Sequence, residues 1–187
     1  MTQNLAESVS AIATIGHGAD APAAFLQRCR SGGVRLIVDV RTAPGSRRHP
    51  HFARSAMEEW LPREGIAYRW ELRLGGFRRP RPDSVNMAWR HPAFRGYADH
   101  LSSEDFRVGI EIVLAEAHEP GVAVMCSETL WWRCHRRLIA DHLVLVRGIE
   151  VRHVVSRGLV EPHRPTEGAA LEGGVLTYPG REMALPL

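Results

Sequence analysis

Short apolar runs alternate along the chain with segments whose apolar residues recur at helical spacing. The apolar runs predict strands, and they lie at 11–15, 34–40, 66–70, 122–126 and 149–155. The segments with helical spacing lie between them, at 20–30, 53–64, 104–118 and 133–147. This alternation is typical of an α/β fold. We expect an open, mostly parallel, doubly wound sheet of about five strands, flanked by helices as a three-layer sandwich.

Residues at the helix ends support these boundaries. Asp20 is placed to cap the first helix, because a short polar side chain there accepts hydrogen bonds from free backbone N–H groups. A shorter helical segment is expected around 89–101. Ser102 or Ser103 then caps the helix that follows it.

The pattern assigns one α/β domain to residues 11–155. The polar residues 1–10 are expected to be frayed. Residues 156–187 are rich in Gly, Pro and Glu and have little apolar periodicity, so we expect a loosely structured C-terminal tail, with a hairpin through 175–178. No internal repeat or low-complexity segment is evident.

Polar and reactive side chains follow three of the predicted strands. His17 follows the first strand, Asp39 and Arg41 follow the second, and Cys126 and Glu128 follow the fourth. The carboxyl ends of parallel strands share one edge of a sheet, where open α/β folds bind their ligands. We therefore expect these side chains to form one pocket.

Composition narrows the chemistry further. The 24 basic residues are all arginine, so a catalytic base must be histidine or a carboxylate, and a lysine Schiff base is excluded. The three cysteines, Cys29, Cys126 and Cys134, are too few for a disulfide framework, which favours a cytoplasmic location. No apolar run approaches the roughly 20 residues of a membrane span, so we expect no membrane partner.

Several short motifs resemble the bacterial family called domain of unknown function 488. The motifs follow in order: Thr14-Ile15-Gly16-His17, Val38-Asp39-Val40-Arg41 with Pro44, Leu74-Gly75-Gly76, Cys126-x-Glu128 and Cys134-His135-Arg136. The resemblance extends over about residues 11–155 and implies an α/β fold with a pocket built from these motifs. It implies no activity.

Two departures from the family pattern bear on the ligand. Gly18 stands where the family usually has serine, so one hydroxyl is missing. Residues 130–132 are Leu-Trp-Trp, where polar residues are expected. The second departure points to a distinct ligand, such as an aromatic one.

Five residues are candidates for catalysis. Cys134 lies at the predicted helix start beside several arginines, which lower a thiol pKa, and Cys126 ends the preceding strand. Asp39, His17 and Glu128 are candidate acid–base groups. Each residue has a structural alternative: the cysteines as packing residues, and the carboxylates as caps or ion-pair partners.

A second set of side chains is expected to bind the substrate. An anion fits arginine and histidine groups near a helix N-terminus, and the candidates are Arg41, Arg47, His51, His135 and Arg136. An aromatic substrate group fits Trp131 and Trp132. Nucleic-acid binding is an alternative, although the basic residues are spread along the chain without a known binding motif.

The sequence thus indicates a hydrolase or transferase acting on an anionic small molecule such as a nucleotide. The alternatives are a nucleic-acid-binding module without catalysis and a metal- or haem-binding protein. His17, Cys126, Cys134 and His135 are possible zinc ligands, but no CxxC or HxxxH spacing occurs, so the fold must bring them together. We therefore assign no metal and no cofactor from the sequence.

Overall fold

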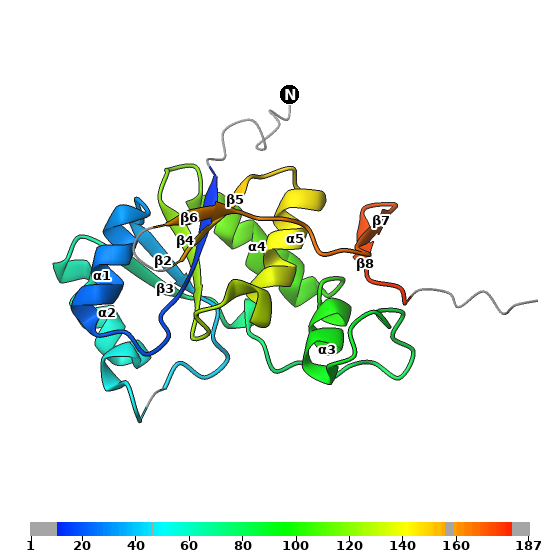
Figure 1. Ribbon diagram of the computed structural model, residues 1–187, viewed down its shortest axis with the longest axis horizontal. Coiled ribbons are helices and arrows are strands. Elements are labelled where there is room, and N and C mark those ends of the chain that lie inside the picture. The colour runs from blue at the N-terminus through cyan, green and yellow to red at the C-terminus, as the bar shows by residue number, and fades with distance from the viewer. Residues whose placement is uncertain (1–10, 46, 156–158, 181–187) are drawn as a thin grey trace, which may run out of the picture.

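The computed structural model describes residues 11–45, 47–155 and 159–180. Its centre is a six-stranded sheet in the order β3-β2-β4-β1-β5-β6 (Figure 1). The strands are β1 (Ile12–Gly16), β2 (Leu36–Asp39), β3 (Ala67–Trp70), β4 (Val122–Cys126), β5 (Val151–Val154) and β6 (Val160–Pro162). The first five strands are parallel, and β6 pairs antiparallel with β5.

Helices cover both faces of this sheet. They are α1 (Pro22–Ser31), α2 (Arg54–Arg63), α3 (Pro92–His100), α4 (Glu104–Glu116) and α5 (Arg136–Leu145). In Figure 1 the sheet is seen nearly edge-on, with α1 and α2 on one side of it and α4 and α5 on the other. The three-layer α/β sandwich expected from the sequence is therefore confirmed.

Strand β4 shows why the sandwich has two cores. Its five residues are all buried, which explains the uninterrupted apolar run. Val122, Val124 and Cys126 face the helices α3 to α5, whereas Ala123 and Met125 face α1 and α2. The helices contribute large apolar side chains to the two cores, among them Phe106, Ile110, Leu138 and Leu143 on the first face and Phe25, Met57 and Leu61 on the second.

The order of the strands creates a crevice between β1 and β4. These two strands are neighbours, but the chain leaves β1 for α1 on one face and leaves β4 for α5 on the other. Loops that diverge in this way open a crevice outside the carboxyl ends of the strands. Strand β2 lies on the other side of β4. The side chains that follow β1, β2 and β4 therefore share this edge, as expected from the sequence.

Helix boundaries agree with the sequence in part. Ser103 caps α4, since its hydroxyl accepts from the Phe106 N–H at 3.1 Å. The Asp20 cap is wrong: Ala21 occupies the cap position, and Asp20 forms an ion pair with Arg28. The last long helix begins later than expected, at Arg136, because a 3-10 turn (η4, Trp131–Arg133) precedes it.

The segment after β5 is more ordered than the loose tail expected from the sequence. Beyond β6, strands β7 (Ala170–Glu172) and β8 (Val175–Thr177) form a hairpin, as expected near 175–178. Tyr178 follows the hairpin and is fully buried, and its hydroxyl donates to Asp141 of α5 at 2.8 Å. The expectations for residues 1–10, 156–158 and 181–187 lie outside the described residues.

A chain of buried hydrogen bonds joins this segment to the sheet. His163 donates from Nε2 to the Asp141 carboxylate at 2.9 Å. Its Nδ1 shares a hydrogen bond with Nε2 of His153 of β5 at 3.0 Å, and Nδ1 of His153 shares one with the Thr14 hydroxyl at 2.7 Å. All four side chains are almost completely buried, so each hydrogen bond in the chain replaces one that the polar group would otherwise make with water.

No helix among the described residues is long and apolar enough to cross a membrane.

The docked C-terminal segment gives a first prediction. Tyr178→Phe removes the hydroxyl that donates to the buried Asp141 carboxylate, so the free energy of unfolding should fall by about 1–2 kcal/mol. Urea denaturation measures this change. Leu171→Ala, at an exposed position on β7, is the control and should change stability by less than about 0.5 kcal/mol. Equal stability of Tyr178→Phe and the wild type would contradict the docking.

Candidate functional site

The loops that leave β1 and β4 stay hydrogen-bonded beyond the sheet. The His17 N–H donates to the Cys126 carbonyl at 3.0 Å, and the Gly18 N–H donates to the Ser127 carbonyl at 2.8 Å. A Cβ atom on Gly16 would lie 1.8 Å from the Glu128 carbonyl oxygen, so only glycine fits there. Gly18 has a φ of 57°, which favours glycine as well. The Gly-His-Gly sequence is thus required by the close approach of these two loops.

A cavity of about 840 Å³ opens at this edge of the sheet. Its walls come from five parts of the chain, at 17–18, 41–49, 76–77, 91–97 and 126–135, with Ser46 outside the description. This volume lies within the range of small-molecule sites. The predicted site residues that line it are His17, Arg41, Arg47, Cys126, Glu128, Cys134 and His135. The single pocket inferred from the strand ends is therefore present in the structure.

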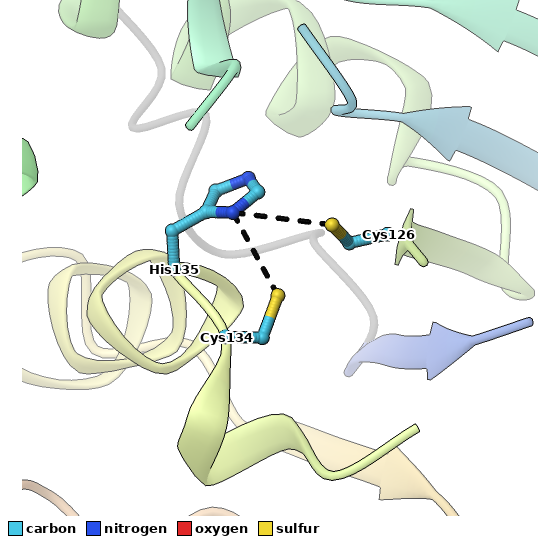
Figure 2. Close-up of side chains that lie close together, drawn as sticks. All are labelled: Cys126, Cys134 and His135. Atoms are coloured by element: carbon cyan, nitrogen blue, oxygen red, sulfur yellow. Dashed lines mark hydrogen bonds between the residues drawn. The ribbon is translucent and has the colours of Figure 1, made fainter. Parts of the chain in front are cut away.

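Cys126, Cys134 and His135 form a tight cluster in the cavity wall (Figure 2). The imidazole Nδ1 of His135 lies 3.9 Å from the Cys126 sulfur and 3.7 Å from the Cys134 sulfur. All three donor atoms lie within 4.8 Å of one another. Both cysteines are free thiols and are buried.

The ring of His135 is fixed in one orientation. Its Nε2 lies 3.2 Å from the carbonyl oxygen of Val40, which can only accept, so Nε2 carries the proton. Nδ1 therefore faces the two sulfurs, and in the neutral form of the ring it carries the lone pair. Tyr97 packs against the ring at 4.9 Å, and a Cβ atom on Gly76 would lie 3.1 Å from Nδ1. The Leu-Gly-Gly motif thus leaves space beside the cluster.

Arg136 lies behind the cluster and is only 1% exposed. Its Nε donates to the Cys134 sulfur at 3.4 Å, and Nη2 donates to the Glu128 carbonyl. No carboxylate in the described part of the chain forms an ion pair with it. A buried cation needs a compensating charge, and the Cys134 sulfur is the group placed to supply it.

The pKa values of the two thiols are displaced in opposite directions. Burial raises the pKa of Cys134, but hydrogen bonding with Cys126 and the charges of His135 and Arg136 lower it more, to well below the usual value. Hydrogen bonding to Cys134 and burial raise the pKa of Cys126 well above its usual value. The first proton is therefore lost from Cys134.

Asp39 is not a free acid–base group. It is completely buried, and both of its oxygens accept from the Arg41 guanidinium, at distances from 2.5 to 3.0 Å. The Tyr68 hydroxyl donates to the same carboxylate at 2.6 Å. The structure therefore favours the ion-pair alternative for Asp39, which holds Arg41 in the cavity wall.

Both ring nitrogens of His17 also have hydrogen-bond partners. Its Nδ1 donates to the Gly18 carbonyl at 2.9 Å, which leaves Nε2 to accept from Arg41 at 3.1 Å. Its ring stacks on Phe52 at 4.2 Å. Burial, followed by the charge of Arg41, lowers the pKa of His17 from 6.5 to about 4. His17 is therefore neutral near pH 7 and orients Arg41.

Some of the remaining predicted residues lie in the cavity wall, and the others lie outside it. Arg47 and Glu128 are exposed in the cavity wall. His51 lies outside it and contacts the Asp20 carbonyl at 3.0 Å. Trp131 stacks on His153 at 4.0 Å, so it belongs to the buried histidine chain. Trp132 is 43% exposed and does not line the cavity.

Several residues of the cavity wall were missed by the sequence analysis. Arg48 and Arg133 add positive charge, and Phe77, Phe94 and Tyr97 add aromatic surface. In each of the doublets Arg47-Arg48 and Arg136-Arg137, the sequence gave no means of deciding which arginine belongs to the site. Phe77 is unusual in the structure in two ways. It is a large apolar side chain that is 86% exposed, and its φ of 45° is uncommon for a residue other than glycine.

The fold and the cavity together define a class of protein: a three-layer α/β protein with a thiol–imidazole cluster in an arginine-lined pocket at the carboxyl ends of its strands. A family model described as "Domain of unknown function DUF488" matches residues 21–143, which is more than half of the chain. The chain belongs to this family. Comparisons with curated proteins and with solved structures found no match.

The Asp39–Arg41 pair gives a prediction that separates packing from catalysis. Asp39→Asn leaves the buried Arg41 without its counter-ion, so the free energy of unfolding should fall by roughly 3–5 kcal/mol. Glu58→Gln is the matched control, because it removes an exposed carboxylate paired with Arg54, and should cost less than about 1 kcal/mol. Chemical denaturation of both variants provides the comparison. An unchanged melting temperature for Asp39→Asn would return Asp39 to the catalytic candidates.

His17 gives a prediction about acid stability. Its pKa is 6.5 when unfolded and about 4 when folded, so the unfolded state holds more protons between these values. The stability contributed by the neutral ring is present above about pH 6.5 and is lost as the pH falls to about 4; at about 1.4 kcal/mol per pKa unit, this loss is on the order of 2–3 kcal/mol.

Urea denaturation at several pH values tests this dependence. His17→Gln should lose less stability than the wild type between pH 7 and pH 4.5, because it has no proton to bind. His91→Asn is the control: His91 is exposed and caps α3, and asparagine can replace it as a cap. Parallel curves for His17→Gln and the wild type would show that His17 is not held neutral.

Proposed function

We propose that the cavity is the active site of a hydrolase or transferase whose substrate is an anionic small molecule such as a nucleotide. The cluster of Cys126, Cys134 and His135 lies at the reacting centre, because it brings two thiols and an imidazole together in the cavity wall. The free thiols favour the cytoplasm as the location.

The charge of the cavity wall is the observation that carries the proposal. Arg47, Arg48 and Arg133 line the cavity, and none of them forms an ion pair with a carboxylate in the described residues. Glu128 is the one carboxylate among the described residues of the wall. Arg41 adds a fourth guanidinium, although Asp39 neutralises it. An excess of unpaired arginine favours phosphate or carboxylate groups.

The aromatic part of the wall narrows the substrate class. Phe77 and Phe94 line the cavity together with the imidazole rings of His49 and His91. A molecule that combines an anionic group with a flat ring satisfies both kinds of surface, and a nucleotide has both. A cavity of about 840 Å³ fits such a molecule better than a long nucleic acid, for which an extended basic surface is expected.

The reaction class follows from the groups that are present. The cluster supplies sulfur and imidazole atoms, which act as nucleophiles, bases or metal ligands. The chain has no lysine, so imine chemistry through a lysine side chain is excluded. Cleavage or transfer of a group on the bound anion is the chemistry that these residues support.

Isothermal titration calorimetry with nucleoside phosphates and the matching nucleosides tests the proposal. The phosphorylated ligands should bind and the nucleosides should bind much more weakly. Arg47→Gln and Arg133→Gln should each weaken phosphate binding by about tenfold, which corresponds to about 1.4 kcal/mol per lost contact. Arg35→Gln is the control, since Arg35 is exposed just before β2, at the opposite edge of the sheet.

Two results would overturn the proposal. Nucleosides that bind as tightly as nucleotides would show that the arginines do not select an anion. Equal losses in Arg35→Gln and Arg133→Gln would show a general charge effect rather than a site.

A further inference from the structure

We propose that Cys126, Cys134 and His135 bind a divalent metal ion of the zinc class, with an open coordination position that faces the cavity. The inference deepens the proposed function and rests on it for the role of the metal, but the ligand set stands on its own geometry. The metal would lie where the bound anion meets the wall of the cavity.

The separations of the three donor atoms fit a shared ion. Nδ1 of His135 lies 3.9 and 3.7 Å from the two sulfurs, and no pair of donors is further apart than 4.8 Å. Zinc–sulfur and zinc–nitrogen bonds of about 2.3 and 2.0 Å in a tetrahedron place sulfur and nitrogen about 3.5 Å apart. The two sulfur–nitrogen separations are thus within a few tenths of an ångström of this value, and the 4.8 Å limit on the three donors leaves the two sulfurs at most about 1 Å beyond the roughly 3.8 Å expected between two zinc-bound sulfurs.

The orientation of His135 is that of a metal ligand. The backbone carbonyl of Val40 accepts the Nε2 proton, so Nδ1 is directed to the sulfurs and binds the ion through its lone pair when the ring is neutral. Metal-bound histidines almost always donate their other N–H to a carbonyl or carboxylate, which fixes the tautomer before the ion arrives. Gly76 keeps side-chain atoms away from Nδ1.

The donor types select the metal. Two sulfurs and one imidazole nitrogen suit zinc and similar soft or borderline ions, whereas magnesium and calcium require oxygen ligands. Both thiols bind as thiolates, so any proton that they still carry passes to solvent, and no oxidation or reduction takes place. Two thiolates balance the charge of the ion.

Arg136 then has a second role at this site. Its Nε donates to the Cys134 sulfur at 3.4 Å and adds one positive charge behind the balanced centre. The net charge of the metal, its ligands and Arg136 is therefore positive. An anionic fourth ligand compensates this charge, which agrees with a cavity that selects anions.

Three protein ligands and one open position are the arrangement of catalytic rather than structural zinc. All three ligand residues line the cavity, so the open position is accessible to water or to a substrate oxygen. A zinc ion polarises such an oxygen and makes bound water a nucleophile near neutral pH, which is the chemistry that a hydrolase requires.

Metal analysis of the full chain tests the inference. The protein is purified in the presence of a phosphine reductant, loaded with zinc sulfate and dialysed, and its zinc content is measured by mass spectrometry. We expect one zinc per chain. Cys126→Ser, Cys134→Ser and His135→Gln should each bind less than a fifth of this amount. Cys29→Ser is the matched control and should bind as the wild type does, because Cys29 is buried in the opposite core.

Two measurements on the wild type do not depend on the folding of the variants. Cobalt(II) in place of zinc should give a sulfur-to-cobalt charge-transfer band in the near ultraviolet and the strong visible bands of a tetrahedral site. Zinc should also protect Cys126 and Cys134 from alkylation and leave the low reactivity of Cys29 unchanged; burial raises the pKa of Cys29 to about 12.

The inference is overturned if the wild type binds no zinc, if the three ligand variants bind as much as Cys29→Ser, or if cobalt shows no sulfur band. Formation of a Cys126–Cys134 disulfide by a mild oxidant, with zinc neither bound nor protective, would assign the pair a redox role instead. Zinc binding without nucleotide binding contradicts the proposed function alone, whereas nucleotide binding without zinc contradicts this inference alone.

Discussion

The parallel pairing of β1 with β4 is the constraint on which the site depends. Because the chain leaves these strands towards opposite faces, their loops diverge and open the crevice. Two backbone hydrogen bonds continue the pairing past the sheet, and Gly16 permits this close approach since it has no side chain. The loop from β4 is thereby fixed at its start, and Cys126 is placed opposite the residues that precede α5. The register of β1 against β4 therefore determines where Cys126 lies in the cavity wall.

Two buried arginines complete the site, and each is compensated in a different way. Arg41 is held by the carboxylate of Asp39 and by the neutral ring of His17, so its charge is balanced within the wall. Arg136 has no carboxylate partner in the described residues and donates instead to the sulfur of Cys134. Arg41 is therefore a fixed part of the cavity wall. Arg136 acts on the thiol cluster, because its charge favours the thiolate form of Cys134 where burial alone would favour the thiol.

The sequence was sufficient to predict the sandwich, the parallel strands and the convergence of three strand ends, since these depend on apolar periodicity. It could not reveal which polar groups satisfy one another. Asp39, His17 and Arg41 have the residue types of a catalytic set, yet their mutual hydrogen bonds make them a supporting set. The Cys126–Cys134–His135 cluster has no familiar spacing, because one ligand ends a strand and the others follow a 3-10 turn. Weak periodicity after residue 155 also concealed a segment that is held by buried polar groups rather than by an apolar face.

That C-terminal segment bears on the site through helix α5. Asp141, near the middle of α5, accepts hydrogen bonds from His163 and Tyr178 of the segment, while the residues at the amino end of the same helix are His135 and Arg136. Trp131 stacks on His153 and fixes the 3-10 turn that immediately precedes Cys134. The segment and the buried histidines therefore hold α5 and the turn before it in one position. A ligand set or a thiolate needs donor atoms placed to within a few tenths of an ångström, and these buried polar contacts, remote from the cavity, supply the rigidity that such placement requires.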